Sequence, residues 1–235
     1  MALKTKGIIP RMWRKLKRLL LILFILHLLY LFLLKWIYPP ITLTQASAWI
    51  SGDGLKRDYV AREEISSYAR LAVIASEDQL FPDHNGFDWK SINKAIDNNR
   101  SRPTRVRGAS TISQQVAKNV FLWQGRSWVR KGLEVYFTFM IELIWGKKRI
   151  LDIYLNVIEM GKGVYGIQAA SREFFNKDAA KLNRREAAMI AAALPNPKRY
   201  TIKPLSRYVS NRQQWVIRQM NNIQSDPDIQ ELITK

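Results

Sequence analysis

The stretch that decides the fold of this chain is the segment from residue 77 to residue 88, which reads Glu77-Asp78-Gln79-Leu80-Phe81-Pro82-Asp83-His84-Asn85-Gly86-Phe87-Asp88. It ends a helix-patterned apolar run and opens into a turn rich in proline, asparagine and glycine. Glu77 is therefore expected at the mouth of a helix, near aromatic residues. An apolar setting raises the proton affinity of a carboxylate, as a general base requires. Taken alone, an acidic pair at a helix end is more often solvated, so its interpretation depends on the later segments of the chain.

Four further segments come after residues 77–88 in a fixed order. They are Gly108 to Asn119, Arg130-Lys131 with Glu134, Lys148 to Asn156, and Gly161 to Leu194. Together, the five segments resemble the signatures of the peptidoglycan glycosyltransferases, with the closest resemblance to monofunctional members that have no penicillin-binding domain. The likeness covers roughly residues 45 to 205. Two positions depart from the family pattern: Asp152 stands where glutamate is more frequent, and Asn176 where glycine is frequent.

The resemblance implies both a fold and an activity. The fold is mainly α: a lysozyme-like helical domain with a small membrane-proximal lobe, preceded by one N-terminal transmembrane helix. The activity is polymerisation of lipid II into linear glycan strands. The growing chain is transferred from undecaprenyl pyrophosphate to a sugar hydroxyl of an acceptor lipid II, with inversion. The implied location is the inner (cytoplasmic) membrane, with the catalytic domain outside the cytoplasm. Other cell-wall synthesis or division proteins are conceivable partners.

The N-terminal part of the sequence has the pattern of a membrane anchor. Residues 1–18 carry seven lysines and arginines and no acidic residue, and residues 19–38 are almost wholly apolar. At ~1.5 Å per residue, such a helix spans about 30 Å, the thickness of a bilayer core. The basic flank predicts a cytoplasmic N-terminus. A cleaved signal peptide is the alternative, since Ala46-Ser47-Ala48 resembles a cleavage site, but the apolar core exceeds the usual ~7–15 residues.

The sequence beyond the anchor reads as one helical domain. A basic tail over 1–18 and the helix over 19–38 are followed by a linker over 39–54 and a domain over 55–235. Period-two alternation is scarce, which predicts helices rather than strands. The expected helices cover about residues 63–80, 110–122, 127–145, 147–158, 164–175, 184–194 and 204–224. Residues 97–107 are polar and basic, and we expect a loop there, beside the site and able to gate a phosphorylated substrate.

The net charge of +19 bounds the partners of the chain. A basic surface fits nucleic acid, anionic lipid headgroups or a phosphorylated substrate. A domain held outside the cytoplasm meets little nucleic acid, so we expect lipid II, its pyrophosphate-linked glycan product and the membrane as partners, and no nucleic acid. The sequence contains no cysteine, which is compatible with an oxidising compartment but does not require one.

The reaction implied by the resemblance needs a base and a cationic cradle. Glu77 is the expected general base on the acceptor hydroxyl. Asp78 tunes Glu77, holds the local fold or is solvated. His84 is more consistent with a turn residue bonded to backbone than with a catalytic one.

The leaving pyrophosphate is assigned to the second and third motifs. The helix opening at Ser110 and Thr111 is expected to present free N–H groups to phosphate, although an ordinary helix cap fits Thr111 equally. The other expected substrate ligands are Gln115, Lys118, Asn119, Arg130 and Lys131.

Glu134 is the second acid that the resemblance implies is essential. It either orients the neighbouring cations or holds a divalent cation, Mg²⁺ or Mn²⁺. From spacing alone, its pairing with Arg130 is an ordinary surface ion pair between residues four apart.

Two other functions compete with glycosyl transfer. A lysozyme-like enzyme that cleaves glycan strands expels a sugar and needs a second carboxylate opposite a raised-pKa acid. A pyrophosphate leaves as a stable anion that cationic side chains can stabilise, and this sequence supplies such side chains. A non-catalytic, membrane-anchored cell-wall scaffold would have no need of the acidic and basic motif residues. Apolar residues between the second and third motifs, including Trp123, Trp128 and Val129, fit either core packing or a lobe that dips into the bilayer.

Overall fold

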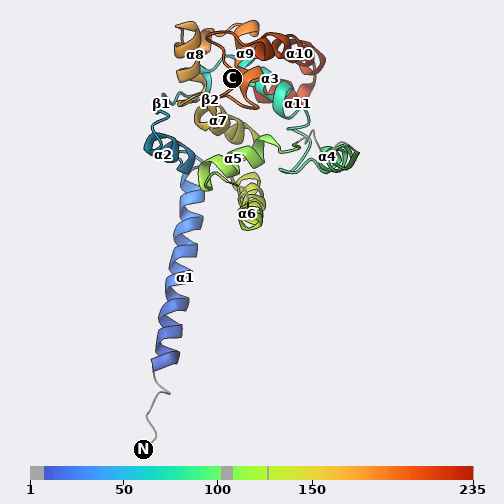
Figure 1. The fold of residues 1–235 in the computed structure, drawn as a ribbon. Helices are drawn as coiled ribbons and strands as arrows, with labels where there is room; N and C mark the ends of the chain where they lie inside the picture. The colour runs from blue at the N-terminus through green and yellow to red at the C-terminus, as the bar shows by residue number, and fades with distance from the viewer. Residues whose placement is uncertain (1–7, 102–107, 126, 235) are drawn as a thin grey trace, which may run out of the picture. The chain divides into compact units, whose positions relative to one another are not determined.

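The computed structural model describes residues 8–101, 108–125 and 127–234, with side chains from residue 12 onward. It divides the chain into two units, Met1–Ile37 and Tyr38–Lys235. The described residues form eleven α-helices and a small sheet. Figure 1 shows how these elements follow one another along the chain. The prediction of a mainly helical fold is therefore confirmed.

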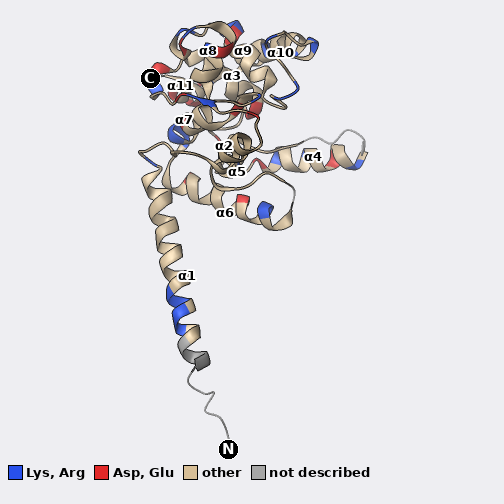
Figure 2. Ribbon diagram, turned by 60° about the vertical axis from the view of Figure 1, so that its left-hand side comes forward, with Lys and Arg blue, Asp and Glu red and all other residues tan. Residues whose placement is uncertain are grey.

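The first unit contains the helix α1 (Ile8–Leu33). Its segment Met12–Leu33 is long and apolar enough to cross a membrane. The helix starts earlier than the predicted span 19–38 and ends at Leu33, before a turn at residues 34–36. Lysines and arginines mark its N-terminal part, as Figure 2 shows. Residues 1–7 of the expected basic tail lie outside the described residues.

The core of the second unit is built on the apolar helix α3 (Ser67–Glu77). Its stretch from Leu71 to Ala75 is buried on every side because three helices pack around it. These helices are α9 (Arg184–Ala193), α10 (Arg207–Ile223) and α11 (Pro227–Ile233). Burial of a whole helix explains why α3 lacks a polar face.

A second group of helices packs on α5 (Ile112–Phe121), which contacts α2 (Leu43–Ile50), α6 (Trp128–Ile144) and α7 (Lys147–Val157). The helix α2 lies inside the predicted linker 39–54. It was missed because it has only eight residues; Thr42 caps it by accepting a hydrogen bond from the backbone N–H of Gln45.

The remaining elements are short. The strands β1 (Lys56–Arg57), β3 (Val164–Tyr165) and β2 (Glu159–Gly161) form a sheet in that order, with β1 parallel and β2 antiparallel to β3. The helix α8 (Ile167–Phe175) follows β3, so the helix expected from residue 164 begins three residues later. Two 3₁₀ turns complete the unit, η2 (Arg62–Glu64) and η3 (Ala179–Lys181).

The helix α4 (Trp89–Ser101) extends away from the rest of the second unit, as both views show (Figures 1 and 2). It corrects the prediction of a loop over 97–107, because residues 97–101 are helical; residues 102–107 lie outside the described residues. None of the α4 residues is buried. Since no apolar face is covered, sequence patterning gave little sign of this helix.

The two departures from the family pattern have structural explanations. Asn176 ends α8 in the left-handed conformation, with φ 54° and ψ 42°. Asparagine is the residue other than glycine that most readily takes this cap position. The shorter side chain of Asp152 is buried in α7, where its Oδ1 accepts from Arg62 at 2.6 Å.

Candidate active site

Glu77 is the last residue of α3, placed there by the buried apolar run that precedes it. Its carboxylate accepts a hydrogen bond from Gln115 Nε2 at 2.9 Å and one from Ser76 Oγ at 3.3 Å. The amide oxygen of Gln115 accepts in turn from the hydroxyl of Tyr154 at 3.2 Å. This chain of bonds fixes the direction of the Glu77 carboxylate from two other helices, α5 and α7.

The environment of Glu77 suits a base. Burial raises the pKa of Glu77, and the hydrogen bond from Gln115 offsets part of that rise. The residue is half-buried and lines a cavity of about 520 Å³, shared with Lys94, Ser110 and Thr111. A carboxylate with raised proton affinity at the edge of a cavity can take a proton from a bound hydroxyl.

Asp78 lies beside Glu77 but points into the fold. It is buried, and its Oδ2 accepts from the backbone N–H of Ile112 at 3.0 Å. His84 Nε2 lies 3.0 Å from each of its carboxylate oxygens. His84 Nδ1 accepts from the backbone N–H of Gly86, which leaves Nε2 as the ring nitrogen that faces Asp78. A solvated Asp78 is therefore excluded, and His84 serves the turn.

Backbone N–H groups at the start of α5 already donate hydrogen bonds within the protein, which the sequence did not indicate. Thr111 forms a capping box with Gln114, and its hydroxyl donates to the carbonyl of Gly86 at 2.7 Å. The N–H of Ile112 is bonded to Asp78 and that of Gln114 to Thr111. The expectation of free N–H groups for phosphate is thus wrong for these two amides. Ser110, in contrast, is exposed at the cavity.

Gly86 lies in the turn that carries His84, and only glycine fits this position. Its φ is +87°, and a Cβ at this position would lie 2.7 Å from Cγ2 of Thr138 in α6. The turn that carries His84 is therefore pressed against α6.

The expected cations meet between α5 and α6. Glu134 is buried, and its two oxygens accept from Arg130 Nη1 at 2.8 Å and from Lys131 Nζ at 2.5 Å. Burial lowers the pKa of Lys118, while the charge of Glu134 acts in the opposite direction. The alternative that spacing alone favours, an exposed surface pair of Arg130 and Glu134, does not hold, because the guanidinium side chain is only 12% exposed and the carboxylate 5%.

One nitrogen of the Arg130 guanidinium donates no hydrogen bond to the described residues. Its Nε is buried and has no hydrogen-bond partner in the part of the chain that the structure describes. A buried N–H without a partner costs free energy, about 1–3 kcal/mol, so such a group favours an incoming acceptor.

Both carboxylate oxygens of Glu134 are engaged by cations. Among the described residues, no group of three or more metal-ligating side chains occurs. In this arrangement Glu134 is paired with Arg130 and Lys131, so a divalent cation at this carboxylate would compete with two ion pairs.

Gln115 joins the two halves of the site. It donates to Glu77, and it also lines a second cavity of about 470 Å³ together with Lys118 and Asn119. Gln115 and Lys118 are three residues apart and so lie on one face of α5. Gln115 thus links Glu77, at the first cavity, to the face of α5 that carries Lys118, at the second cavity. The buried Asn119 packs on α2, where its Oδ1 accepts from Thr44 Oγ1 at 3.3 Å.

Two features of the site escaped the sequence analysis. Tyr154 was recognised only as part of an apolar face, yet its hydroxyl positions Gln115. The second cavity is also lined by Asp53, Glu159 and Lys198, which are far apart in sequence and joined by ion pairs. No local pattern could have placed these three residues together.

Comparison with known proteins identifies the family. The family model "Transglycosylase" matches residues 44–221. The biosynthetic peptidoglycan transglycosylase of Yersinia pestis (strain Pestoides F) is 55% identical over 190 residues, which cover 80% of this chain and 79% of the relative. A protein of the same name from Yersinia pseudotuberculosis serotype O:3 (strain YPIII) is 54% identical over the same coverage.

A mainly helical domain with little sheet and one N-terminal apolar helix is consistent with the lysozyme-like transglycosylase fold. This chain belongs to the transglycosylase family.

Proposed function

We propose that this chain polymerises lipid II into linear glycan strands, as the names of its relatives suggest. The observation that carries the proposal is the position of Glu77. Its pKa is raised by burial, and Gln115 connects it to the face of α5 that carries Lys118. The reaction needs a proton acceptor for a sugar hydroxyl next to a cradle for a diphosphate, and this arrangement supplies both.

The chemistry proceeds by direct displacement. The Glu77 carboxylate accepts the proton of the acceptor hydroxyl while the hydroxyl oxygen attacks the anomeric carbon of the donor. The bond from that carbon to the pyrophosphate oxygen breaks, and the configuration inverts. Lys118, Arg130 and Lys131 neutralise the departing diphosphate, with the free Nε of Arg130 as one donor. Glu134 positions Arg130 and Lys131 and does not contact the reacting atoms.

We propose that a divalent cation, if the reaction requires one, enters the site bound to the substrate. Mg²⁺ or Mn²⁺ would be held mainly by the pyrophosphate oxygens, since Glu134 is already paired. No step of the displacement is assigned to it. Comparing activity with and without a chelator tests its requirement.

The membrane location follows from α1. One N-terminal helix, apolar over Met12–Leu33, fits a single-pass anchor. We propose a cytoplasmic N-terminus and a catalytic unit on the outer side of the inner membrane, because the cations Arg14, Lys15, Lys17 and Arg18 lie at the N-terminal end of this helix, before the uncharged apolar run that starts at Leu19. Reporter fusions to each end of the chain test this orientation.

Replacing Glu77 by glutamine tests the base. A positioned general base contributes about 10²–10⁴ in rate, so we expect Glu77→Gln to lose that factor in lipid II polymerisation. The exposed Glu231→Gln, on α11, should remain fully active. A folded Glu77→Gln enzyme with wild-type activity would contradict the assignment.

The two rival functions give different results in the same assays. Strand cleavage calls for a second available carboxylate, whereas Asp78 is committed to Ile112 and His84. Release of soluble muropeptides without polymer would support cleavage. Rescue of a cellular defect by a chemically inactive variant would support a scaffold.

A further inference from the structure

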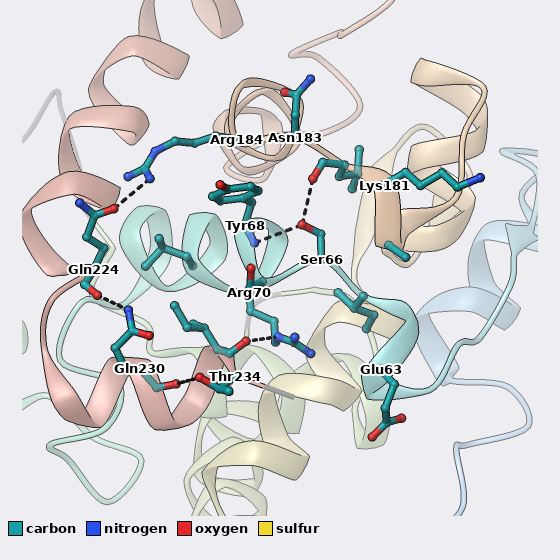
Figure 3. Close-up of a pocket in the computed structure, with 16 residues that line it drawn as sticks. Glu63, Ser66, Tyr68, Arg70, Lys181, Asn183, Arg184, Gln224, Gln230 and Thr234 are labelled. Carbon is teal, nitrogen blue, oxygen red and sulfur yellow. Dashed lines mark hydrogen bonds between the residues drawn. The ribbon is translucent and has the colours of Figure 1, made fainter.

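A further cavity lies at the opposite end of α3 from Glu77. It has a volume of about 770 Å³. Figure 3 shows that its labelled side chains come from the start of α3, the start of α9 and the C-terminal helices. None of the residues assigned to glycosyl transfer lines it.

The charges around this cavity favour an anion. Arg70, Lys181 and Arg184 line it, against a single carboxylate, that of Glu63. Lys181 is exposed at the rim and Arg184 is half-buried. The lining also includes the apolar residues Leu71, Leu182 and Ile233.

Two helices of ten or more residues begin at the cavity. Ser66 caps α3 by accepting from the N–H of Tyr68, and its hydroxyl donates to the carbonyl of Leu182 at 2.9 Å. Asn183 caps α9 by accepting from the N–H groups of Arg185 and Glu186. In both helices the caps leave the first amide without an intrahelical partner, and the positive ends of the dipoles converge.

Two of the arginines that line the cavity each have a buried guanidinium nitrogen with no partner among the described residues. Arg70 is fully buried; its Nε donates to the carbonyl of Ile233 and its Nη1 to that of Arg62, but its Nη2 is unpaired within the described ranges. Arg184 bonds Gln224 and Asn221 through its two terminal nitrogens, while its buried Nε is likewise unpaired. Two orphaned N–H donors at one cavity call for an acceptor that the fold itself does not provide.

We infer that this cavity is a binding site for an oxyanion, a phosphate or carboxylate group on a small molecule whose apolar part packs against Leu71, Leu182 and Ile233. Guanidinium groups and helix N-termini both recognise this chemistry. The site is separate from the donor cradle of the proposed reaction.

The test is a titration of the full chain in detergent with inorganic phosphate and, separately, with acetate, each compared with chloride at equal ionic strength. The readout is the side-chain Nε–H signal of Arg184 in ¹⁵N-arginine-labelled protein, which distinguishes this cavity from the cradle. We expect saturable displacement of that signal, and we expect it to persist in Arg130→Gln. Tighter binding of phosphate would identify a phosphate-bearing ligand, and tighter binding of acetate a carboxylate-bearing one.

Two matched variants sharpen the result. Lys181→Gln removes a cation at the cavity and should weaken binding at least tenfold, whereas Arg207→Gln removes an exposed cation elsewhere and should leave it unchanged. The inference is overturned if neither anion saturates, if both variants behave alike, or if the response disappears in Arg130→Gln.

Discussion

At the scale of single residues, the site separates two adjacent carboxylates into two roles. Glu77 is half-buried at a cavity and carries a raised pKa. Asp78, the next residue, is buried and holds both the start of α5 and His84. The difference arises because Glu77 ends the helix while the backbone of Asp78, with φ −161°, has already left it.

The hydrogen bond from Gln115 predicts a shift in the pH profile. This donor stabilises the ionised form of Glu77, so Gln115→Leu should raise the pKa of Glu77 further. A general base works ionised, and the acidic limb of kcat/KM should therefore move to higher pH. The measurement is polymerisation against pH. Gln79→Leu, which alters the same cavity but bonds Ala75 and Gln219, is the control and should leave the limb in place.

The buried hydrogen bonds of Asp78 predict that its replacement lowers the stability of the fold. Asp78→Asn removes an acceptor from the buried His84 Nε2–H and weakens the bond to Ile112. A buried donor without a partner costs about 1–3 kcal/mol, so the free energy of unfolding should fall by about that amount. Denaturant titration measures it. The exposed Asp83→Asn should change stability by less than about 0.5 kcal/mol, and equal effects of the two changes would refute the structural role.

At the scale of elements, the sequence predicted those helices whose caps and apolar faces are local. The ends of α5, α6, α7, α9 and α10 fall within about three residues of expectation. The helices α2, α4 and α11 were missed: α2 and α11 have only eight and seven residues, and α4 buries none of its residues. Trp89, Ile92 and Ile96 of α4 do recur at helical spacing, but they stand among polar residues, and this signal was too weak to predict a helix.

For the candidate site, too, the sequence predicted local relations but not contacts between distant segments. Motif residues could be named, and the meeting of Arg130, Lys131 and Glu134 follows from their spacing on one helix. The sequence could not predict that the backbone N–H of Ile112 donates a hydrogen bond to Asp78, because those residues are 34 positions apart and meet only in the folded chain.

At the scale of the whole molecule, two surfaces are suited to lipid. The first is the apolar helix α1. The second is α6, where Trp128 is 91% exposed and Leu143 70%, with Val129 and Phe139 also exposed. Core packing is thus excluded for Trp128 and Val129, whereas the neighbouring Leu122 is in the core. Exposed apolar residues grouped on one helix indicate a membrane or protein contact.

The α6 surface predicts a substrate-dependent defect. The double variant Trp128→Ser and Phe139→Ser should raise the KM for lipid II embedded in vesicles several-fold, because the enzyme loses its apolar contact with the bilayer. Activity on a short-chain, soluble lipid II analogue should be unaffected. Leu205→Ser, a change at an exposed leucine outside α6, is the control. An equal defect on both substrates would point to a structural effect instead.

The central claim is that Glu77 and the α5–α6 cations act on one substrate pair. The most direct test is the structure of the full chain with a non-reactive lipid II donor analogue and an acceptor. The account predicts phosphate oxygens within about 3 Å of Lys118 Nζ and Arg130 Nε, and the acceptor hydroxyl at the Glu77 carboxylate. Phosphates bound away from both cations, with Glu77 facing no reacting hydroxyl, would contradict it.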